Sequence, residues 1–223
     1  MFPLGSVLLP GMALPLRIFE ARYRVIMSEL VAAEPPEFGV VLIERGSEVG
    51  GGETRTDVGC RAVVARAAEQ PDGTWSVLAV GTRRLRVSRW LPDDPYPVAE
   101  VVDWPDERRA GGEPAEGDPA GSDPADVDPA DADLEGRIHQ LESQARRVAA
   151  LAVELGARGQ LPDVELSPDP ELRVYQLATL STLGALDRRR LLEAPDLHGR
   201  VVLLGDLLAE QELLLGARLT FDD

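Results

Sequence analysis

The segment formed by residues 105–133 most constrains how this chain can fold. It reads PDERRAGGEPAEGDPAGSDPADVDPADAD, in which the units DPAGS, DPADV and DPADA follow one another at five-residue intervals. The segment carries 10 carboxylates against 2 arginines, and it has almost nothing apolar to bury, so it cannot offset the entropy lost on ordering. We therefore expect an acidic, disordered linker between residues 1–104 and 134–223. An acidic tether for a basic partner is the alternative interpretation.

Residues 1–104 alternate mostly with a period of two, which predicts strands. The expected strands are FGVVLIE (38–44), VGCRAVVARAAE (58–69), TWSVLAV (74–80), RRLRVSRWL (83–91) and YPVAEVVDW (96–104). The connections between them, PDG at 71–73, Gly81 and PDDP at 92–95, are typical of antiparallel turns. One helix is expected over 19–33, with its apolar stripe formed by Phe19, Tyr23, Ile26, Met27 and Leu30. This half of the chain is predicted to be a small β-barrel or sheet with one helix.

Residues 134–223 change to helical spacing. The apolar stripe of the first expected helix, over 134–156, consists of Ile138, Leu141, Ala145, Val148, Ala152 and Leu155. Further helices are expected over 170–181, with Pro170 in the first turn, over 187–193, with Asp187 as N-cap, and over the leucine-rich 197–219. The fold class is therefore α+β, with an all-α helical bundle after the linker.

The glycine-rich stretch GSEVGGGETRTDVG, residues 46–59, resembles a phosphate-binding loop only superficially. Aligned on a G-x-x-x-x-G-K-[ST] loop from Gly46, it has Gly52 at the lysine position and Glu53 at the hydroxyl position. A strand is expected after it, so no helix N-terminus points at the loop. We interpret it as a connection between two strands that binds no nucleotide.

The composition provides few side chains that could support catalysis or bind a cofactor. The chain has no lysine and no asparagine, one cysteine and two histidines, which excludes a phosphate-loop lysine and a Ser–Lys dyad within these residues. Cys60 lies among valines and alanines, where a buried, inert thiol is expected. His139 and His198 fall in separate helices without metal-ligand spacing. We expect no enzyme activity, no metal and no cofactor.

The charge argues against nucleic-acid binding. The formal net charge is −16, whereas binding to phosphate backbones needs a basic surface. Residues 1–104 are closer to balance, with 11 arginines against 14 carboxylates. Their arginine strand, with Arg83, Arg84, Arg86 and Arg89, is the best candidate, but Arg83 faces opposite to Arg84 and Arg86. A solvated strand face is the preferred interpretation, and an RNA-binding barrel stays open as an alternative.

Several blocks of the sequence resemble one known family. These blocks are FPLGSVLLPGMALPLRIFEARYRVIM (2–27), FGVVLIERGSEVGGG (38–52), DVGCRAVV (57–64), GTRRLRVSRWLPDDPYPVAEV (81–101) and LDRRRLLEAPDLHGRVVLLGDLLAEQELLL. Together they resemble the Lon N-terminal substrate-binding domain, and the P-L-R-I-F-E-x-R-Y-R run after an LPG turn is the most specific part. Ala21 stands where the family usually has proline. The family's first strand usually begins a few residues earlier than Met1, so the resemblance implies a start upstream.

The resemblance implies a PUA-like β-barrel followed by a helical bundle. In the full-length protease this domain recruits polypeptides for an ATPase module and a Ser–Lys protease module, neither of which these residues contain. The chain is similar to stand-alone members of the family, which implies a recognition module for proteostasis. A relative with a small-molecule pocket on its barrel suggests a ligand-binding alternative. Trp75, Trp90 and Trp104 are expected to fill the core instead of forming an aromatic cage.

We therefore expect a cytoplasmic, non-enzymatic module that binds unfolded polypeptide or a partner protein. No stretch approaches the roughly 20 apolar residues of a membrane span, so no membrane partner is expected. If apolar side chains are exposed, the two stretches of interest are the turn before residue 15 and the end of the last helix. The candidate polypeptide-binding residues there are Leu9, Met12, Leu14, Leu213, Leu214 and Leu215.

Overall fold

The computed structural model shows two compact units that are discontinuous in sequence. The described residues are 1–48, 51–107, 129–156 and 165–222. The first unit combines Met1–Pro105 with Leu183–Glu193, and the second combines Asp106–Thr182 with Ala194–Asp223. The predicted disorder of the acidic segment concerns mainly residues 108–128, which lie outside the described residues.

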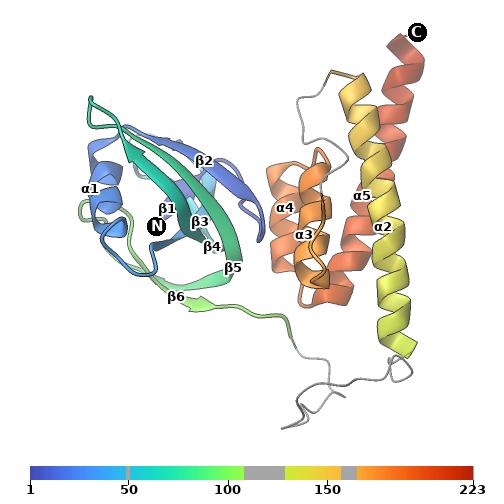
Figure 1. Ribbon diagram of the computed structural model, residues 1–223, viewed down its shortest axis with the longest axis horizontal. Helices are drawn as coiled ribbons and strands as arrows, with labels where there is room; N and C mark the ends of the chain where they lie inside the picture. Colours follow the sequence, from blue (N-terminus) through green and yellow to red (C-terminus); the bar gives the residue numbers. More distant parts are fainter. Residues whose placement is uncertain (49–50, 108–128, 157–164, 223) are drawn as a thin grey trace. The chain divides into compact units, whose positions relative to one another are not determined.

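The first unit is built on a mixed sheet. Its described strands are β1 (Phe2–Leu4), β2 (Ala13–Ile18), β3 (Glu37–Arg45), β4 (Thr54–Glu69), β5 (Trp75–Trp90) and β6 (Ala99–Asp103). The order is β1-β3-β4-β5-β2, with β6 also paired to β5. Only the β1–β3 pairing is parallel among these described strands. The sheet curls into a half-barrel beside α1 (Figure 1), so the α+β fold class is confirmed.

One long strand, β5, replaces two predicted strands and a predicted turn. Its first half pairs with β2 and its second half with β6, while β4 follows its other edge. Gly81 lies between these halves and was expected to be a turn residue, which is wrong. A Cβ atom at Gly81 would lie 2.3 Å from the carbonyl oxygen of Leu9. Glycine is needed there because another backbone segment approaches closely.

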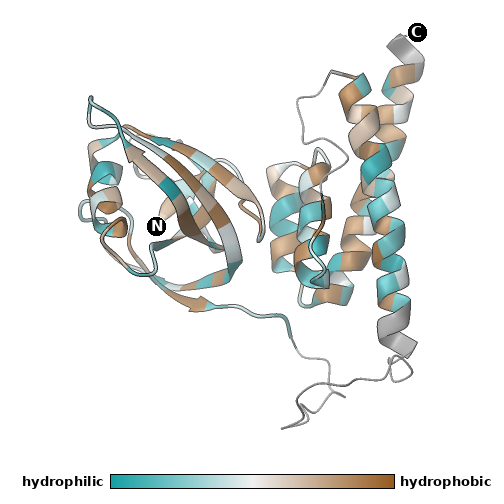
Figure 2. Ribbon diagram, viewed as in Figure 1, coloured by the Kyte–Doolittle hydropathy of each residue, from teal (hydrophilic) through white to brown (hydrophobic). Residues whose placement is uncertain are grey.

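Helix α1 (Ala21–Leu30) closes the core of the first unit. Its buried residues are Tyr23, Ile26, Met27 and Leu30, as the predicted stripe requires. Phe19 precedes the helix and is exposed, so its assignment to the stripe is wrong. The Phe2 ring stacks on Tyr23 with 4.9 Å between ring centroids, an arrangement that contributes about 1 kcal/mol beyond area burial. In Figure 2 the strands carry both hydrophobic and hydrophilic residues.

Helix α4 (Ala185–Glu193) belongs to the sheet unit, although it lies among the helices in the sequence. It contacts β4, and its buried residues are Leu191 and Leu192. Asp187 lies in the first turn of α4 and not at its N-cap. The helix therefore begins two to three residues earlier than predicted. Residues 183–193 were expected to belong to the helical part of the chain. They belong to the sheet unit instead, because α4 packs its apolar face against the sheet.

The second unit contains three described helices, α2 (Pro129–Glu154), α3 (Pro170–Leu180) and α5 (Leu197–Asp222). Helix α2 begins inside the segment expected to be linker, where Pro129 at the start suits a first helical turn. Helices α2 and α5 run parallel, since Arg137 approaches His198 and Arg147 pairs with Glu212. The predicted α2 stripe is confirmed by its buried members Ile138, Leu141, Ala145, Val148 and Ala152.

Helix α3 starts as its sequence predicts. The Asp169 carboxylate accepts hydrogen bonds from the backbone N–H groups of Glu171 and Leu172, which satisfies two donors that a helix start leaves open. Pro170 occupies the first turn, where its missing N–H costs nothing. Val174 and Leu177 of α3 are buried in the core of the unit.

Candidate binding surfaces

The end of α5 carries the most exposed leucine of the described residues. Leu213 is 76% exposed and Leu214 is 59% exposed, while Leu215 is half-buried. The other exposed large apolar side chains of the described residues are Phe19, Val25, Val31, Leu78, Val102, Val153, Leu186 and Val202. Two consecutive exposed leucines on a regular helix are typical of a contact surface.

The two exposed leucines lie on different faces of α5. Leu204, Leu207 and Leu208 are buried, and Leu214 continues the same stripe two turns after Leu207. Helix α3, which contacts α5, ends at Leu180. The Thr182 hydroxyl reaches Gln211 at 3.4 Å. Beyond that point, Leu214 has no comparable cover within the described ranges. Leu213 instead lies on the solvent-facing side of α5, one turn after the exposed Ala209.

An ion pair holds this end of α5 to α2. Arg147 Nε donates to Glu212 Oε1 at 2.9 Å, and this hydrogen bond lowers the pKa of the Glu212 carboxyl. Both side chains are accessible to solvent, so the pair contributes little to stability. It does fix the position of the helix turn from which Leu213 and Leu214 project. Leu213 and Leu214 therefore have a fixed position on α5, which packs against α2.

The other expected patch lies mostly inside the first unit. Leu9 and Leu14 are buried, and Met12 is half-buried against the core. The turn is closed onto β5 by hydrogen bonds from the Gly11 N–H to the Gly81 carbonyl and from the Gly81 N–H to the Met12 carbonyl. The apolar side chains are therefore used for packing, and the expectation of an open patch at Leu9 and Leu14 is wrong.

The arginines of the arginine strand form ion pairs and ring contacts within the protein. Arg83 pairs with Glu37 and Asp103, and Arg89 pairs with Glu100. Arg84 is buried, and Arg84 and Arg86 both lie over the Trp104 ring, with 4.7 and 3.9 Å to its centroid. The predicted opposite facing of Arg83 and Arg84 is thus observed, and the strand offers no row of free guanidinium groups to a phosphate backbone.

Arg84 also anchors α4. Its Nη1 donates to the Leu192 carbonyl at 2.7 Å, where the last helical turn leaves carbonyl groups without helical partners. A cation at this end is favourable for the helix dipole as well. Sequence reasoning missed this role, because the arginine strand was interpreted as a solvated strand face, whereas Arg84 is buried.

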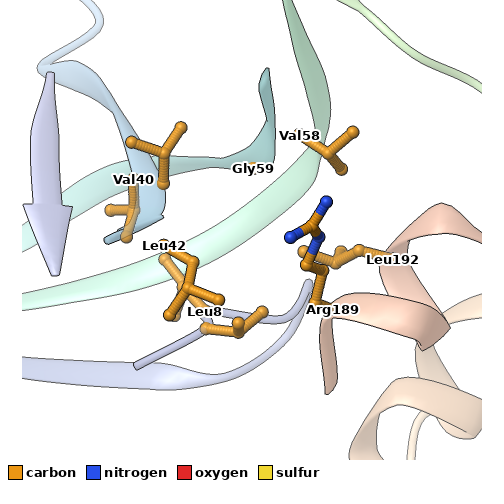
Figure 3. A pocket seen from close by; sticks show the side chains of 9 residues that line it. Leu8, Val40, Leu42, Val58, Gly59, Arg189 and Leu192 are labelled. Carbon is orange, nitrogen blue, oxygen red and sulfur yellow. The ribbon is translucent and has the colours of Figure 1, made fainter. Parts of the chain in front are cut away.

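A seam between α4 and the sheet forms an enclosed pocket (Figure 3). Its lining residues are Val7, Leu8, Val40, Val41, Leu42, Val58, Gly59, Arg189 and Leu192. The empty space amounts to about 210 Å³, but no part of it is wide enough to hold a water molecule. The Arg189 side chain lies along the seam and pairs with Glu44 and Glu193. The seam is a packing interface and offers no room for a small-molecule ligand.

Residues that could support catalysis are separated or buried. Cys60 is buried, and burial raises the pKa of its thiol to about 12, so a nucleophilic thiolate is strongly disfavoured. The glycine-rich stretch connects two strands, β3 and β4, as predicted, although β4 begins at Thr54 and not at residue 58. Gly51 and Gly52 have positive φ, and residues 49 and 50 lie outside the described residues. No cluster of three metal-ligating side chains occurs in the ranges searched. Among the described helices, none combines the length and apolar character needed to cross a bilayer.

Comparisons with known proteins agree on one family. A family model described as ATP-dependent protease La (LON) substrate-binding domain matches residues 1–210. Lon protease 2 of Herpetosiphon aurantiacus is 35% identical over 101 residues, which are 44% of this chain and only 12% of that protease.

Two solved structures match nearly the whole chain. A Lon N-terminal domain protein from Xanthomonas campestris has 27% identity and a TM-score of 0.56, over 93% of this chain and 95% of that chain. The N-terminal domain of Mycobacterium avium complex Lon protease has 17% identity and a TM-score of 0.56, over 92% of this chain and 93% of that chain. At 17% identity the second likeness supports the fold alone.

Proposed function

Because its residues 1–210 match the LON substrate-binding domain, this chain belongs to that family, and we propose that it is a non-catalytic module that recognises unfolded polypeptide. A substrate-binding domain implies protein substrates. The proposal adds that recognition needs neither an ATPase nor a protease module, and that it takes place in the cytoplasm. Within these 223 residues there is no lysine for a phosphate loop or a Ser–Lys dyad.

The exposed leucines of α5 carry the proposal. An unfolded polypeptide presents apolar side chains without fixed geometry, and a helix surface with adjacent leucines can bury them without requiring a particular sequence. Each leucine that becomes fully buried contributes about 1.5–3 kcal/mol. Leu213 and Leu214 are already positioned on a formed helix, so their ordering costs little when a polypeptide binds.

The test is fluorescence anisotropy with a fluorescein-labelled, reduced and carboxymethylated polypeptide, titrated without ATP at low and moderate salt. We expect saturable binding that survives salt, and the double variant Leu213→Ser/Leu214→Ser should bind about tenfold more weakly or worse. Leu186→Ser is the matched control, because Leu186 is 67% exposed on α4. It should bind like the unmodified chain.

The outcomes separate the site from the function. If the double variant binds as tightly as the unmodified chain, polypeptide recognition stands but uses another surface. If the unmodified chain binds no polypeptide, the proposed function is wrong. A labelled RNA in a parallel titration checks the alternative, since phosphate binding would weaken steeply with salt.

A further inference from the structure

Helix α4 holds three consecutive arginines but only two carboxylates. Arg189 donates to Glu193, and it also reaches Glu44 on β3. Arg190 donates to Asp187 at 3.2 Å. Both acidic groups of the helix are thereby engaged by Arg189 and Arg190. Arg188 cannot share Asp187 readily, because adjacent residues on a helix do not face each other.

Arg188 lies instead against the turn that precedes β2. Its Nη1 donates to the Met12 sulfur at 3.8 Å, a weak contact for a charged donor. Its Nε is buried and has no hydrogen-bond partner, and no carboxylate pairs with its guanidinium in the described part of the chain. Burial lowers the pKa of this guanidinium, which reflects the cost of desolvating the charge without compensation.

This arrangement is an exception among the buried and half-buried arginines of the first unit. Arg84, which is buried, has a carbonyl acceptor, and Arg55, which is half-buried, has carboxylate acceptors. A half-buried cation without an acceptor destabilises the fold, and such exceptions are expected where a ligand completes the hydrogen bonds. A carboxylate matches the planar donor group of arginine, and the Met12 thioether supplies an apolar neighbour for the adjoining ligand carbons.

We propose that Arg188 and Met12 form a subsite for a carboxylate of a bound polypeptide, supplied by its C-terminus or by an acidic side chain. A single carboxylate is favoured over a phosphorylated ligand, because a protein with a net charge of −16 repels multiply charged anions more strongly. The identity of the ligand as a polypeptide rests on the proposed function. The carboxylate preference of Arg188 does not, so the two can be tested separately.

The first test addresses the subsite without a polypeptide. The probe is N-acetylleucine, titrated into the ¹⁵N-labelled full chain while the Nε–H resonance of Arg188 is followed by NMR, with N-acetylleucine amide as the matched neutral probe. We expect a saturable shift with the acid and none with the amide. The resonance is assigned by its disappearance in Arg188→Gln. Equal responses to acid and amide, or no response to either, would overturn the subsite.

The second test identifies the source of the carboxylate. Labelled apolar peptides are compared with a free C-terminus, with a C-terminal amide, and with a C-terminal amide plus one internal glutamate. We expect the amide to bind about tenfold more weakly than the free acid, and Arg188→Gln to abolish that difference. Arg190→Gln, an exposed arginine of the same helix, should retain it.

Each outcome of the peptide series decides one part of the proposal. Recovery of affinity by the internal glutamate would identify an acidic side chain as a source of the carboxylate, and no recovery would identify the C-terminus. Equal binding of free acid and amide would overturn carboxylate recognition while leaving the proposed polypeptide binding intact. If no peptide binds but N-acetylleucine still shifts the Arg188 resonance, polypeptide recognition fails and the subsite takes a small carboxylate.

Discussion

Arg200 and Asp106 form a two-pronged ion pair inside the helical unit. The Arg200 Nη1 and Nη2 atoms lie 3.1 and 2.5 Å from the two Asp106 carboxylate oxygens. The Arg200 side chain is completely buried, while that of Asp106 is 14% exposed, and the guanidinium also lies over the Tyr175 ring. The neighbouring Glu107 N–H donates to the Pro195 carbonyl. These contacts fix residues 106 and 107 to the start of α5.

Removing Asp106 should destabilise the helical unit strongly. Asp106→Ala leaves the buried Arg200 without its counter-charge, and the expected loss in the free energy of unfolding is about 3 kcal/mol or more. Adding Arg200→Met removes the uncompensated charge and should recover much of that loss. Urea denaturation followed by circular dichroism measures both. Arg190→Ala is the control, because its partly exposed pair with Asp187 should contribute less than about 1 kcal/mol. Equal losses for Asp106→Ala and Arg190→Ala would contradict the prediction.

Alanine should have opposite effects at two glycines. At Gly81 the new Cβ would meet the Leu9 carbonyl oxygen at 2.3 Å, so Gly81→Ala forces two backbone segments apart and should cost more than about 2 kcal/mol. At Gly136, within α2, nothing lies within 4 Å, so Gly136→Ala should stabilise by about 0.5–1 kcal/mol. A melting temperature of Gly81→Ala equal to or above that of the unmodified chain would refute this account of Gly81, and a lower melting temperature of Gly136→Ala would refute the account of Gly136.

The thiol of Cys60 should be unreactive in the native protein. Burial raises its pKa to about 12, so a thiol reagent at pH 8 should react slowly without urea and rapidly in urea. The same shift affects stability, because the unfolded thiol ionises near its ordinary value of 9.0 while the folded thiol stays protonated. The free energy of unfolding should therefore fall as the pH rises above about 9. Cys60→Ala should make this decline shallower, and an unchanged slope would exclude the thiol as its source.

Replacing Arg84 should loosen α4, whereas replacing Arg83 should not. Arg84→Met removes a buried donor to the Leu192 carbonyl, and the expected loss is about 2 kcal/mol with faster hydrogen exchange in α4. Arg83→Met removes ion pairs at the surface, worth less than about 1 kcal/mol. Similar exchange rates in α4 for both variants would show that Arg84 does not anchor the helix.

The periodicity predicted the element types well, because an element buried on one face has apolar residues at a regular spacing in its sequence. The α2 stripe from Ile138 to Ala152 and the capping of α3 by Asp169 follow from local spacing and local hydrogen bonds. Gly81 was predicted wrongly because the sequence does not distinguish a glycine that permits two backbone segments to approach closely from a glycine that forms a turn. Only the position of the Leu9 carbonyl distinguishes them.

The sites were less predictable than the elements, because exposure depends on partners distant in the sequence. Leu9 and Leu213 are both leucines in apolar runs, yet one is buried in the first unit and the other lies on the solvent-facing side of α5. For the arginines of α4 the sequence gives part of the answer. Arg189 has Glu193 four residues later, whereas Arg188 has Leu192 there. The second partner of Arg189, Glu44, belongs to a strand and is brought to it only by the fold.

The insertion of α4 into the first unit affects how the chain is made. A ribosome releases Met1–Pro105 well before Leu183–Glu193, and synthesis of the intervening residues takes on the order of ten seconds. During that interval the nascent sheet lacks the helix that covers Val58 and Leu8. The amino-terminal unit is thus finished only late in translation, and its final folding step must wait for most of the helical segment to be synthesised.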